Sequence, residues 1–394
     1  MPSLRRTVHV AVLTLLLAAL TPPADGTARG SRRPPPTTER TTPMPTEESR
    51  LLAGRRIVYS YHGPTPPSGL LRIIREGRAA GVILFGENVT PAAEFHDAVE
   101  KLRQAAAEAP GGRPLLLMTD QEGGKVRRLS GEPVLSARST GLAAHPVTAA
   151  AGSGAGAGRN LATAGLNTNL APVLDVYDTP DNFIDHAERS YSQDPAVVAE
   201  LGAAFVTAQQ GLGVAATAKH FPGLGAAARD RNTDEGPVTL DVGLDELRAR
   251  GEAPYRAAIA AGVRLVMTSW AVYPALDAAH PAGFSRTVVQ GELRDRLGFD
   301  GVTITDALEA GALASYGDTP GRALAAAEAG MDLLLCSARD VGQGEAAADA
   351  LATALDSGDL PRPAFLEATT RIDSLRDSLR APLDASFGAS PSRP

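Results

Sequence analysis

Residues 301–336, GVTITDALEAGALASYGDTPGRALAAAEAGMDLLLC, carry the pattern that decides the fold. Two short apolar runs, Gly301–Thr305 and Met331–Cys336, flank the Ala-rich amphipathic stretch Pro320–Gly330. Continuous rather than alternating apolar character is typical of strands that are buried on both faces, as in a parallel sheet. Glycine at the step into the second run is typical of a helix end. The segment therefore predicts a strand, a helix and a second, parallel strand.

The same pattern recurs along the body of the chain. The predicted strands are Arg56–Tyr61, Gly81–Phe85, Pro114–Thr119, Leu166–Val173, Val214–Ala218, Arg264–Thr268, Gly301–Thr305 and Met331–Cys336. Among the predicted helices are Ala92–Ala107, Pro195–Gly211, Leu244–Ala261 and Pro320–Gly330. These eight strand-and-helix units predict an α/β fold, a single-domain (β/α)8 TIM-like barrel, with an open doubly wound sheet as the alternative. In a barrel, reactive side chains are expected directly after the strands, at the C-terminal mouth.

The composition excludes several classes of protein. The chain has 394 residues with 38 Lys and Arg against 45 Asp and Glu, which gives a net charge of −7. An acidic body without a basic cluster argues against nucleic-acid binding. One cysteine, Cys336, excludes an internal disulfide framework and a multi-cysteine zinc site.

Both ends of the chain are predicted to lie outside the barrel. Residues 1–28 predict a signal peptide, because Arg5 and Arg6 precede an apolar run, Val8–Leu20, that is followed by small residues. An uncleaved N-terminal anchor is the alternative, although the run is shorter than the ~20 residues of a membrane-spanning helix. Residues 29–50 are rich in Pro and Thr and predict a disordered linker, residues 51–380 the barrel domain, and residues 381–394 a disordered tail.

Charged residues follow several of the predicted strands. Asp120 opens the segment DQEGGKVRR after the third strand, Lys219 and His220 follow the fifth, and Asp306 follows the seventh. A Lys–His pair in a barrel mouth is costly without a polar ligand or partner, and Asp306 is placed as a carboxylate nucleophile must be. The structural alternatives are a salt-bridged turn at Asp120 and a helix N-cap at Asp306.

A glycine-rich segment, Gly152 to Gly158, could be mistaken for a phosphate-binding loop. A dinucleotide fingerprint directly follows a strand, and the stretch before these glycines is loop-like. We therefore interpret them as the start of a closely packed helix.

Five motifs together resemble glycoside hydrolase family 3, in its single-domain bacterial β-N-acetylglucosaminidase branch. They are DQEGGKVRRL (Asp120–Leu129), NLAPVLDV (Asn169–Val176), AERSYSQDP (Ala187–Pro195), KHFPGLG (Lys219–Gly225) and GVTITDALEAGA (Gly301–Ala312). The resemblance runs from about Ile57 to Ser337. Its specificity comes from the order and spacing of the motifs rather than from any one of them.

The resemblance implies roles for single residues. Asp306 matches the nucleophile that forms a covalent glycosyl-enzyme, which water then hydrolyses with retention of configuration. Asp120 would hydrogen-bond the sugar hydroxyls. The other residues implied for the sugar pocket are Arg128, Arg189, Lys219 and His220. No metal or organic cofactor is implied.

The chain departs from the family pattern where the general acid/base is expected. The family has a Gly-His-Gly turn and then an Asp-Ser-His triplet whose His is the acid/base, whereas this chain has Gly-Leu-Gly and then Asp230-Arg231-Asn232. Asn232 cannot donate a proton as an acid near neutral pH. With a two-residue gap, Asp234 stands opposite that histidine.

Three hypotheses follow from this departure. A carboxylic acid of the loop could protonate the leaving group, and the candidates are Asp230, Asp234 and Glu235. Alternatively, only substrates with good leaving groups are cleaved, or the chain binds sugars without cleaving them. An unrelated barrel enzyme that uses Lys219 as a Schiff base is a fourth possibility, and it requires an unpaired Lys219.

The expected protein is an exported, monomeric glycosidase acting on terminal β-linked N-acetylglucosamine from peptidoglycan or chitin. Glucose or xylose specificity stays open. We expect a carbohydrate partner, no nucleic acid, no stable membrane insertion after signal cleavage, and an extracellular location with or without cell-wall association.

Overall fold

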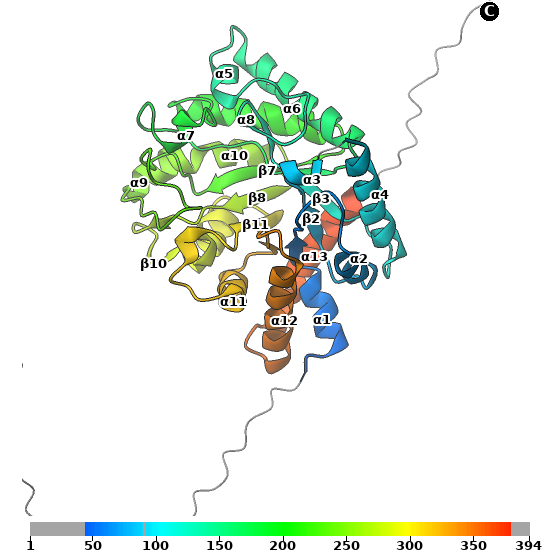
Figure 1. The fold of residues 1–394 in the computed structure, drawn as a ribbon. Coiled ribbons are helices and arrows are strands. Elements are labelled where there is room, and N and C mark those ends of the chain that lie inside the picture. Colours follow the sequence, from blue (N-terminus) through cyan, green and yellow to red (C-terminus); the bar gives the residue numbers. More distant parts are fainter. Residues whose placement is uncertain (1–43, 90–91, 380–394) are drawn as a thin grey trace, which may run out of the picture. The chain divides into compact units, whose positions relative to one another are not determined.

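The computed structural model describes residues 44–89 and 92–379, in which eight parallel strands close into a barrel surrounded by helices (Figure 1). The barrel strands are β1 (Ile57–Tyr59), β2 (Gly81–Ile83), β3 (Leu116–Thr119), β6 (Thr168–Asn169), β7 (Ala215–Phe221), β8 (Leu265–Thr268), β11 (Val302–Ala307) and β12 (Leu333–Leu335). They are neighbours in chain order, and β12 pairs with β1. The predicted (β/α)8 barrel is confirmed, and the doubly wound alternative was wrong.

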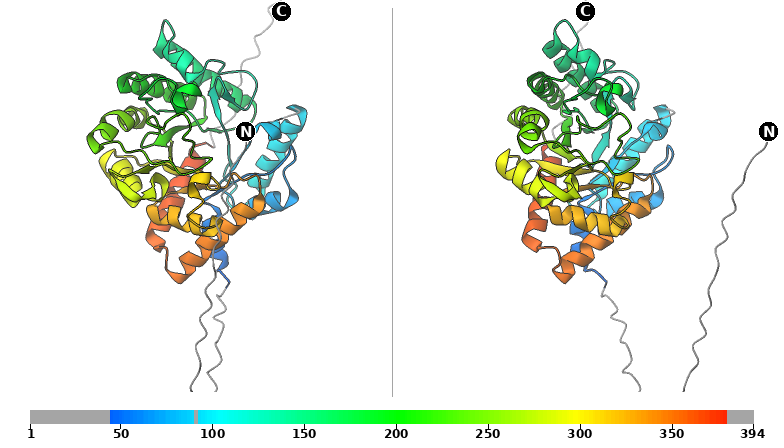
Figure 2. Two further views of the ribbon diagram at one scale, coloured as in Figure 1. Left: turned by 60° about the vertical axis from the view of Figure 1, so that its left-hand side comes forward. Right: turned by 90° about the vertical axis from the view of Figure 1, so that its left-hand side faces the viewer.

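Helices surround the strands on the outside of the barrel (Figure 2). The longer ones are α1 (Glu47–Gly54), α2 (Ser68–Arg75), α4 (Ala92–Glu108), α6 (Pro146–Thr163), α8 (Pro195–Gln210), α10 (Ala253–Ala260), α11 (Thr319–Ala329), α12 (Val341–Ser357) and α13 (Arg362–Ser378). Short helical segments are α3 (Gly86–Val89), α5 (Ala137–Gly141), α7 (Phe183–His186), α9 (Leu244–Glu246), η2 (Ala282–Phe284) and η4 (Gly311–Leu313), and two wider, π-helical segments are η1 (Leu247–Gly251) and η3 (Thr287–Arg296).

The predicted helix Leu244–Ala261 is interrupted in the structure. It is divided into α9, the π-helical segment η1 and α10. Pro254 stands at the start of α10. Because proline has no N–H to donate to the preceding turn, it begins a helix more readily than it continues one.

The start of the folded body was predicted a few residues too late. Helix α1 begins at Glu47, and the hydroxyl of its N-cap Thr46 accepts a hydrogen bond from the Ser49 N–H. The prediction that the linker extends to residue 50 was therefore wrong at this end, because a Thr cap and two following Glu residues favour a helix there. The predicted signal peptide, the linker up to residue 43 and the C-terminal tail lie outside the described residues.

The glycine-rich segment lies within helix α6 rather than at its start. A Cβ atom added to Gly154 would come within 2.3 Å of the backbone oxygen of Phe205 in helix α8. Glycine is therefore required for the close approach of these two helices. The prediction of a closely packed helix is confirmed, whereas the prediction that these glycines begin it was wrong, because the helix already begins at Pro146.

The barrel interior is apolar, and helix α13 covers its N-terminal end. Interior side chains such as Met118, Leu265 and Ile304 are at most 2% exposed and form one cluster with Ile372 and Leu375 of α13. Burying these side chains supplies most of the stabilisation of the domain. The charged residues that line the cavity are therefore found at the C-terminal ends of the strands.

An ion cluster attaches helix α13 to the barrel. The fully buried Asp332 lies 2.7 Å from Arg294 Nη2 and 2.8 Å from Arg371 Nη2 of α13. Asp332 Oδ2 also accepts a 2.8 Å hydrogen bond from the Thr303 N–H of β11. One carboxylate thus joins helix α13 to two adjacent strand starts.

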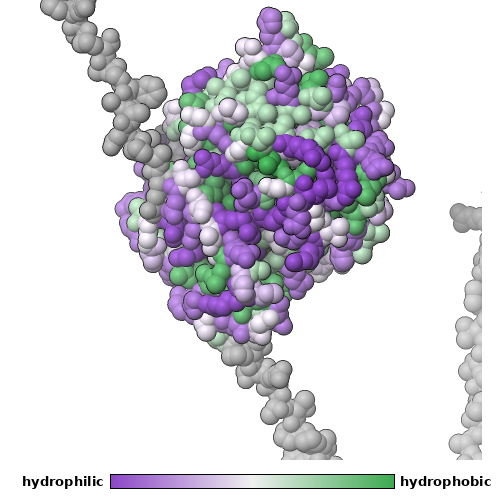
Figure 3. All heavy atoms as spheres, turned by 180° about the vertical axis from the view of Figure 1, so that it is seen from behind, coloured by the Kyte–Doolittle hydropathy of each residue, from purple (hydrophilic) through white to green (hydrophobic). Residues whose placement is uncertain are grey.

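The surface carries no apparent membrane-spanning element in the part of the chain that the structure describes. No helix there is both long and apolar enough to cross a bilayer. The face opposite to that of Figure 1 is mostly hydrophilic, with small groups of hydrophobic residues between the polar ones (Figure 3).

We predict that Asp332→Asn lowers the free energy of unfolding by about 3 kcal/mol, because it leaves two partly buried guanidinium groups without the counter-charge of Asp332. Chemical denaturation measures the effect. Glu108→Gln, which removes the exposed ion pair with Arg75, is the control and should change the midpoint little. Equal effects of the two substitutions would contradict the assigned role of Asp332.

Candidate active site

A cavity of about 530 Å³ opens at the C-terminal ends of the barrel strands. Of the residues predicted for the site, it is lined by Asp120, Arg128, Arg189, Lys219, His220, Asp234 and Asp306. Asp230 and Glu235 do not line it. The structure therefore gathers the predicted sugar-pocket residues and one of the three loop acids around a single space.

Two strand ends supply the charged wall of the cavity. Lys219 lies within strand β7 and is 2% exposed. Its Nζ is 2.7 Å from Asp120 Oδ1 and 2.8 Å from Glu122 Oε1. The Schiff-base alternative requires an unpaired lysine, so this pairing argues against it.

Glu122 also binds the guanidinium of Arg189 through two hydrogen bonds, of 2.9 Å from Nε and 2.8 Å from Nη2. Burial by itself would raise the pKa of Glu122, but the charges of Arg189 and Lys219 outweigh it and hold this pKa well below its usual range. Burial would likewise lower the pKa of Lys219, yet the carboxylates of Asp120 and Glu122 raise it. Glu122, Lys219 and Arg189 are therefore all charged at neutral pH.

The histidine after Lys219 is oriented by a second buried carboxylate. His220 Nδ1 lies 2.7 Å from Asp175 Oδ2, while Asp175 Oδ1 accepts hydrogen bonds from the His220 and Leu224 N–H groups. This network places the ring proton on Nδ1. Nε2 is left facing Arg189 Nη2 at 3.5 Å.

The DQEGGKVRR segment forms a hairpin rather than a ligand-binding turn. Strands β4 (Gln121–Gly123) and β5 (Val126–Arg127) pair through a turn with positive φ at Gly123 and Gly124. A Cβ at Gly123 would come within 2.2 Å of the Leu135 backbone oxygen. The glycines thus admit a neighbouring chain segment.

The hairpin returns Arg128 to Asp120. The Arg128 N–H donates to the Asp120 backbone oxygen at 3.2 Å, and Arg128 Nη2 lies 3.8 Å from Asp120 Oδ2. Asp120 therefore contacts Lys219 on one side and Arg128 on the other. The salt-bridged turn that was predicted at Asp120 therefore forms part of the cavity wall.

Asp306 lies at the end of strand β11 and is partly buried. Its Oδ1 accepts a 2.8 Å hydrogen bond from the N–H of Ala307, which is still part of the strand. No helix starts at Asp306, so the N-cap alternative was wrong. The carboxylate faces the cavity from the strand end, where a nucleophile can meet a bound ligand.

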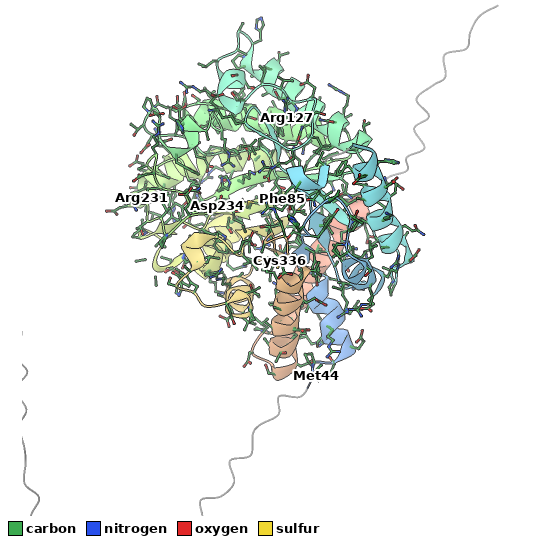
Figure 4. All side chains as sticks on the ribbon, viewed as in Figure 1. Met44, Phe85, Arg127, Arg231, Asp234 and Cys336 are labelled. Carbon is green, nitrogen blue, oxygen red and sulfur yellow. The ribbon has the colours of Figure 1, made fainter. Side chains whose placement is uncertain are left out.

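The loop after β7 brings Asp234 to the cavity. The backbone oxygens of Thr233 and Asp234 accept 2.9 Å hydrogen bonds from the N–H groups of Ala312 and Gly311. A Cβ at Gly311 would come within 2.5 Å of the Glu235 backbone, so glycine lets the loop approach this closely. In Figure 4, Asp234 lies toward the middle of the barrel.

The surroundings of Asp234 shift its pKa upward. Partial removal from water and, after it, the negative charge of Asp306 raise the pKa of Asp234. Although the side chain is exposed toward solvent, it shares the cavity with Asp306. Asp230 is exposed and outside the cavity, and the Glu235 carboxylate is turned to Asn232.

Asn232 supports the backbone beside Asp234. Its Oδ1 accepts a 3.0 Å hydrogen bond from the Asp234 N–H, and its Nδ2 donates to Glu235 Oε1 at 3.1 Å. This side-chain bridge across two residues is a turn that asparagine favours. Asn232 thus shapes the loop that carries Asp234.

Sequence reasoning missed several residues of the site. Glu122 and Asp175 were noted only as members of the sequence motifs. Glu309 and Arg339 were not singled out. Both of the latter line the cavity, and Glu309 Oε1 accepts a 2.6 Å hydrogen bond from the Ser337 hydroxyl. Their positions after strands β11 and β12 were the available signal.

Comparison with protein families gives one match, and it covers most of the chain. The profile of the glycosyl hydrolase family 3 N-terminal domain matches residues 68–375. This range contains every residue that lines the cavity.

Similar proteins come from several organisms. A secreted glycosyl hydrolase of Arthroderma benhamiae, itself uncharacterized, is 47% identical over 334 residues, which are 84% of this chain and 94% of that protein. A β-hexosaminidase of Stenotrophomonas maltophilia is 36% identical over 270 residues, which are 66% of this chain and 77% of the enzyme.

Two solved structures of glycosidases are also similar. A family 3 β-N-acetylglucosaminidase from a Paenibacillus species has a TM-score of 0.79 and 33% identity over 86% of this chain, which spans only 64% of that protein. The β-N-acetylhexosaminidase of Beutenbergia cavernae has a TM-score of 0.75 and 32% identity over 84% of this chain and 98% of that protein.

We predict that Glu122→Gln destabilises the protein by about 3 kcal/mol at pH 7, because it leaves two buried cations short of a counter-charge. Since the folded-state pKa of Glu122 lies below its unfolded value of 4.5, its contribution is complete above that pH and is lost as the pH falls below it. The difference in melting temperature between the wild type and Glu122→Gln should therefore become smaller as the pH falls from 6 to about 3. A constant difference across this range would contradict the prediction.

Proposed function

Since the chain belongs to glycosyl hydrolase family 3 and is a glycoside hydrolase of its β-hexosaminidase branch, we propose that it releases terminal β-linked N-acetylglucosamine with retention of configuration. The observation that carries the proposal is the pair of carboxylates, Asp306 and Asp234, that face one cavity beside a charged wall. Burial and, after it, the charge of Asp306 raise the pKa of Asp234. A retaining glycosidase needs one carboxyl group that can donate a proton beside a second carboxylate that can act as nucleophile.

Asp306 acts as the nucleophile. Its ionised carboxylate attacks the anomeric carbon of a sugar held by Asp120 and the cations of the wall, and it forms a glycosyl ester. The transition state carries positive charge on the sugar ring, which the carboxylate stabilises. Asp306 is suited to this step because its strand fixes its position and its Oδ1 is oriented by the Ala307 N–H.

Asp234 acts as the general acid/base. In the first step the protonated carboxyl group donates its proton to the departing glycosidic oxygen. Esterification then removes the charge of Asp306, so the pKa of Asp234 falls. In the second step the Asp234 carboxylate takes a proton from a water molecule, and the water attacks the glycosyl ester. Retaining enzymes that use two carboxyl groups in this way hold them about 5–5.5 Å apart.

The proposed sugar and location are supported by the relatives. The solved Paenibacillus structure is a β-N-acetylglucosaminidase, and the Arthroderma benhamiae relative is a secreted glycosyl hydrolase. We propose an exported, monomeric enzyme that acts on fragments of peptidoglycan or chitin, with residues 1–28 as its signal peptide. The folded domain then begins after a linker.

Asp306→Asn should reduce turnover of an aryl β-N-acetylglucosaminide by roughly 10³-fold or more, because no covalent intermediate can form. Steady-state hydrolysis measures this. Asp300→Asn, which removes an exposed carboxylate just before the start of the same strand, is the control and should keep wild-type activity. Normal turnover of Asp306→Asn would show that the nucleophile lies elsewhere.

Asp234→Ala should lose about 10²–10⁴-fold on an unactivated disaccharide, because a poor leaving group needs a proton. The first step on an aryl substrate with a good leaving group should be much less affected. Added azide, which needs no general base, should restore aryl turnover and give a β-glycosyl azide. Asp230→Asn and Glu235→Gln test the two other loop acids and should retain most activity on both substrates.

The outcomes separate the three hypotheses for the loop. If Asp230→Asn or Glu235→Gln, rather than Asp234→Ala, loses activity on the disaccharide but not on the aryl substrate, the substituted residue is the acid/base and Asp234 is not. Cleavage of only the aryl substrate by the wild type would mean that no acid has replaced the histidine. Binding without cleavage of either substrate would favour a sugar-binding protein.

A further inference from the structure

Part of the cavity wall has no role in the proposed chemistry. Phe85 follows strand β2, and Ser337 and Arg339 follow β12, so these residues flank the end of β1. The sugar-binding wall and the two carboxylates come instead from strands β3, β7 and β11 and from the loops that follow β3, β6 and β7. The cavity therefore has a second side beyond the reacting groups.

Arg339 is held in a fixed orientation on this side. Its guanidinium carbon lies 4.1 Å from the centroid of the Phe85 ring, and its backbone N–H donates to Ser60 Oγ at 2.8 Å. Its φ of +60° is in the left-handed region, which is unusual for a residue with a side chain. Unfavourable backbone geometry of this kind gathers at binding sites, where the surrounding structure maintains it.

One edge of the guanidinium is left for a ligand. Arg339 Nε lies 3.2 Å from Glu87 Oε1, and the same oxygen lies 3.3 Å from His62 Nδ1, so Glu87 is shared between two partners. Within the described ranges, neither terminal nitrogen of Arg339 has a hydrogen-bond acceptor. The side chain is 43% exposed and faces the cavity.

Two other cations of the cavity, Lys219 and Arg189, differ from Arg339, whereas a third, Arg128, has its Nη2 atom 3.8 Å from Asp120 Oδ2. Lys219 and Arg189 are engaged by Glu122 and, for Lys219, by Asp120 as well. Their charges are therefore balanced within the wall. The two terminal nitrogens of Arg339 form a planar fork that matches a carboxylate, and stacking on an aromatic ring limits the entropy lost when a ligand binds.

We propose that Arg339, stacked on Phe85, forms a second subsite that binds a carboxylate on the leaving group of the substrate. The proposal rests on the proposed function, since a leaving group is defined by the bond that is cleaved. Two kinds of sugar carry such a carboxylate: one with a lactyl ether, as in muramic acid, and one with an oxidised C6, as in a uronic acid.

The test compares three β-linked N-acetylglucosamine disaccharides, whose second sugars are N-acetylmuramic acid, glucuronic acid and neutral N-acetylglucosamine. The quantity of interest is kcat/KM for each acidic substrate divided by that for the neutral one. Arg339→Gln should lower this ratio by roughly 10- to 100-fold, the size expected for a charged hydrogen-bonded pair. Arg339→Gly, which suits the positive φ, should do the same.

Arg231→Gln is the matched control, because Arg231 is exposed, does not line the cavity and lies at the outer edge of the molecule in Figure 4. It should leave the ratio unchanged. A fall of the ratio for one acidic sugar only identifies the source of the carboxylate and supports the proposal. An unchanged ratio in both Arg339 variants, or an equal fall in Arg231→Gln, overturns it.

Binding separates this proposal from the proposed function. If the wild type cleaves none of the disaccharides, the proposed function fails, but calorimetry with Asp306→Asn still compares their affinities. Tighter binding of an acidic disaccharide than of the neutral one, lost when Arg339→Gln is added, supports the subsite. Equal affinities with and without Arg339 overturn it.

Discussion

The carboxylate of Glu122 is the interaction on which the site depends. It contacts Lys219 of strand β7 and Arg189 of the segment before helix α8, and it stands in the hairpin that follows strand β3. Two cations and a carboxylate could not be buried at the end of an apolar barrel without one another. Glu122 and Asp120 together balance the charges of Lys219 and Arg189. All of these groups except Glu122 line the cavity, where they form the polar wall that a ligand meets.

Backbone contacts hold the loop after β7 in place. Hydrogen bonds from Gly311 and Ala312 fix the loop, and they do not depend on the side chain at position 232. Asn232 adds a side-chain hydrogen bond that stabilises the turn beside Asp234, and Asp234 lines the cavity. Burial and, after it, the charge of Asp306 raise the pKa of Asp234, which supports the role of proton donor that we propose for this residue.

Much of the fold could be predicted, because apolar strands that are buried on both faces leave continuous runs in the sequence. The same reasoning placed Asp306 and Lys219 at strand ends. Glu122 was missed because an acid beside two glycines looks like a solvated turn until its partners, distant in sequence, are known. Periodicity likewise could not reveal the break before Pro254, the loop contact at Gly311 or the stacking of Arg339 on Phe85, which depend on segments that only the folded chain brings together.

The central claim is that Asp306 carries the sugar while Asp234 completes its release. The most direct measurement is the intact mass of Asp234→Ala after mixing with an aryl β-N-acetylglucosaminide, followed by mapping of the modified peptide. The account predicts that one N-acetylglucosamine accumulates on Asp306, because the ester forms but lacks a base for its hydrolysis. A variant that turns over without an adduct, or an adduct on another residue, would contradict it.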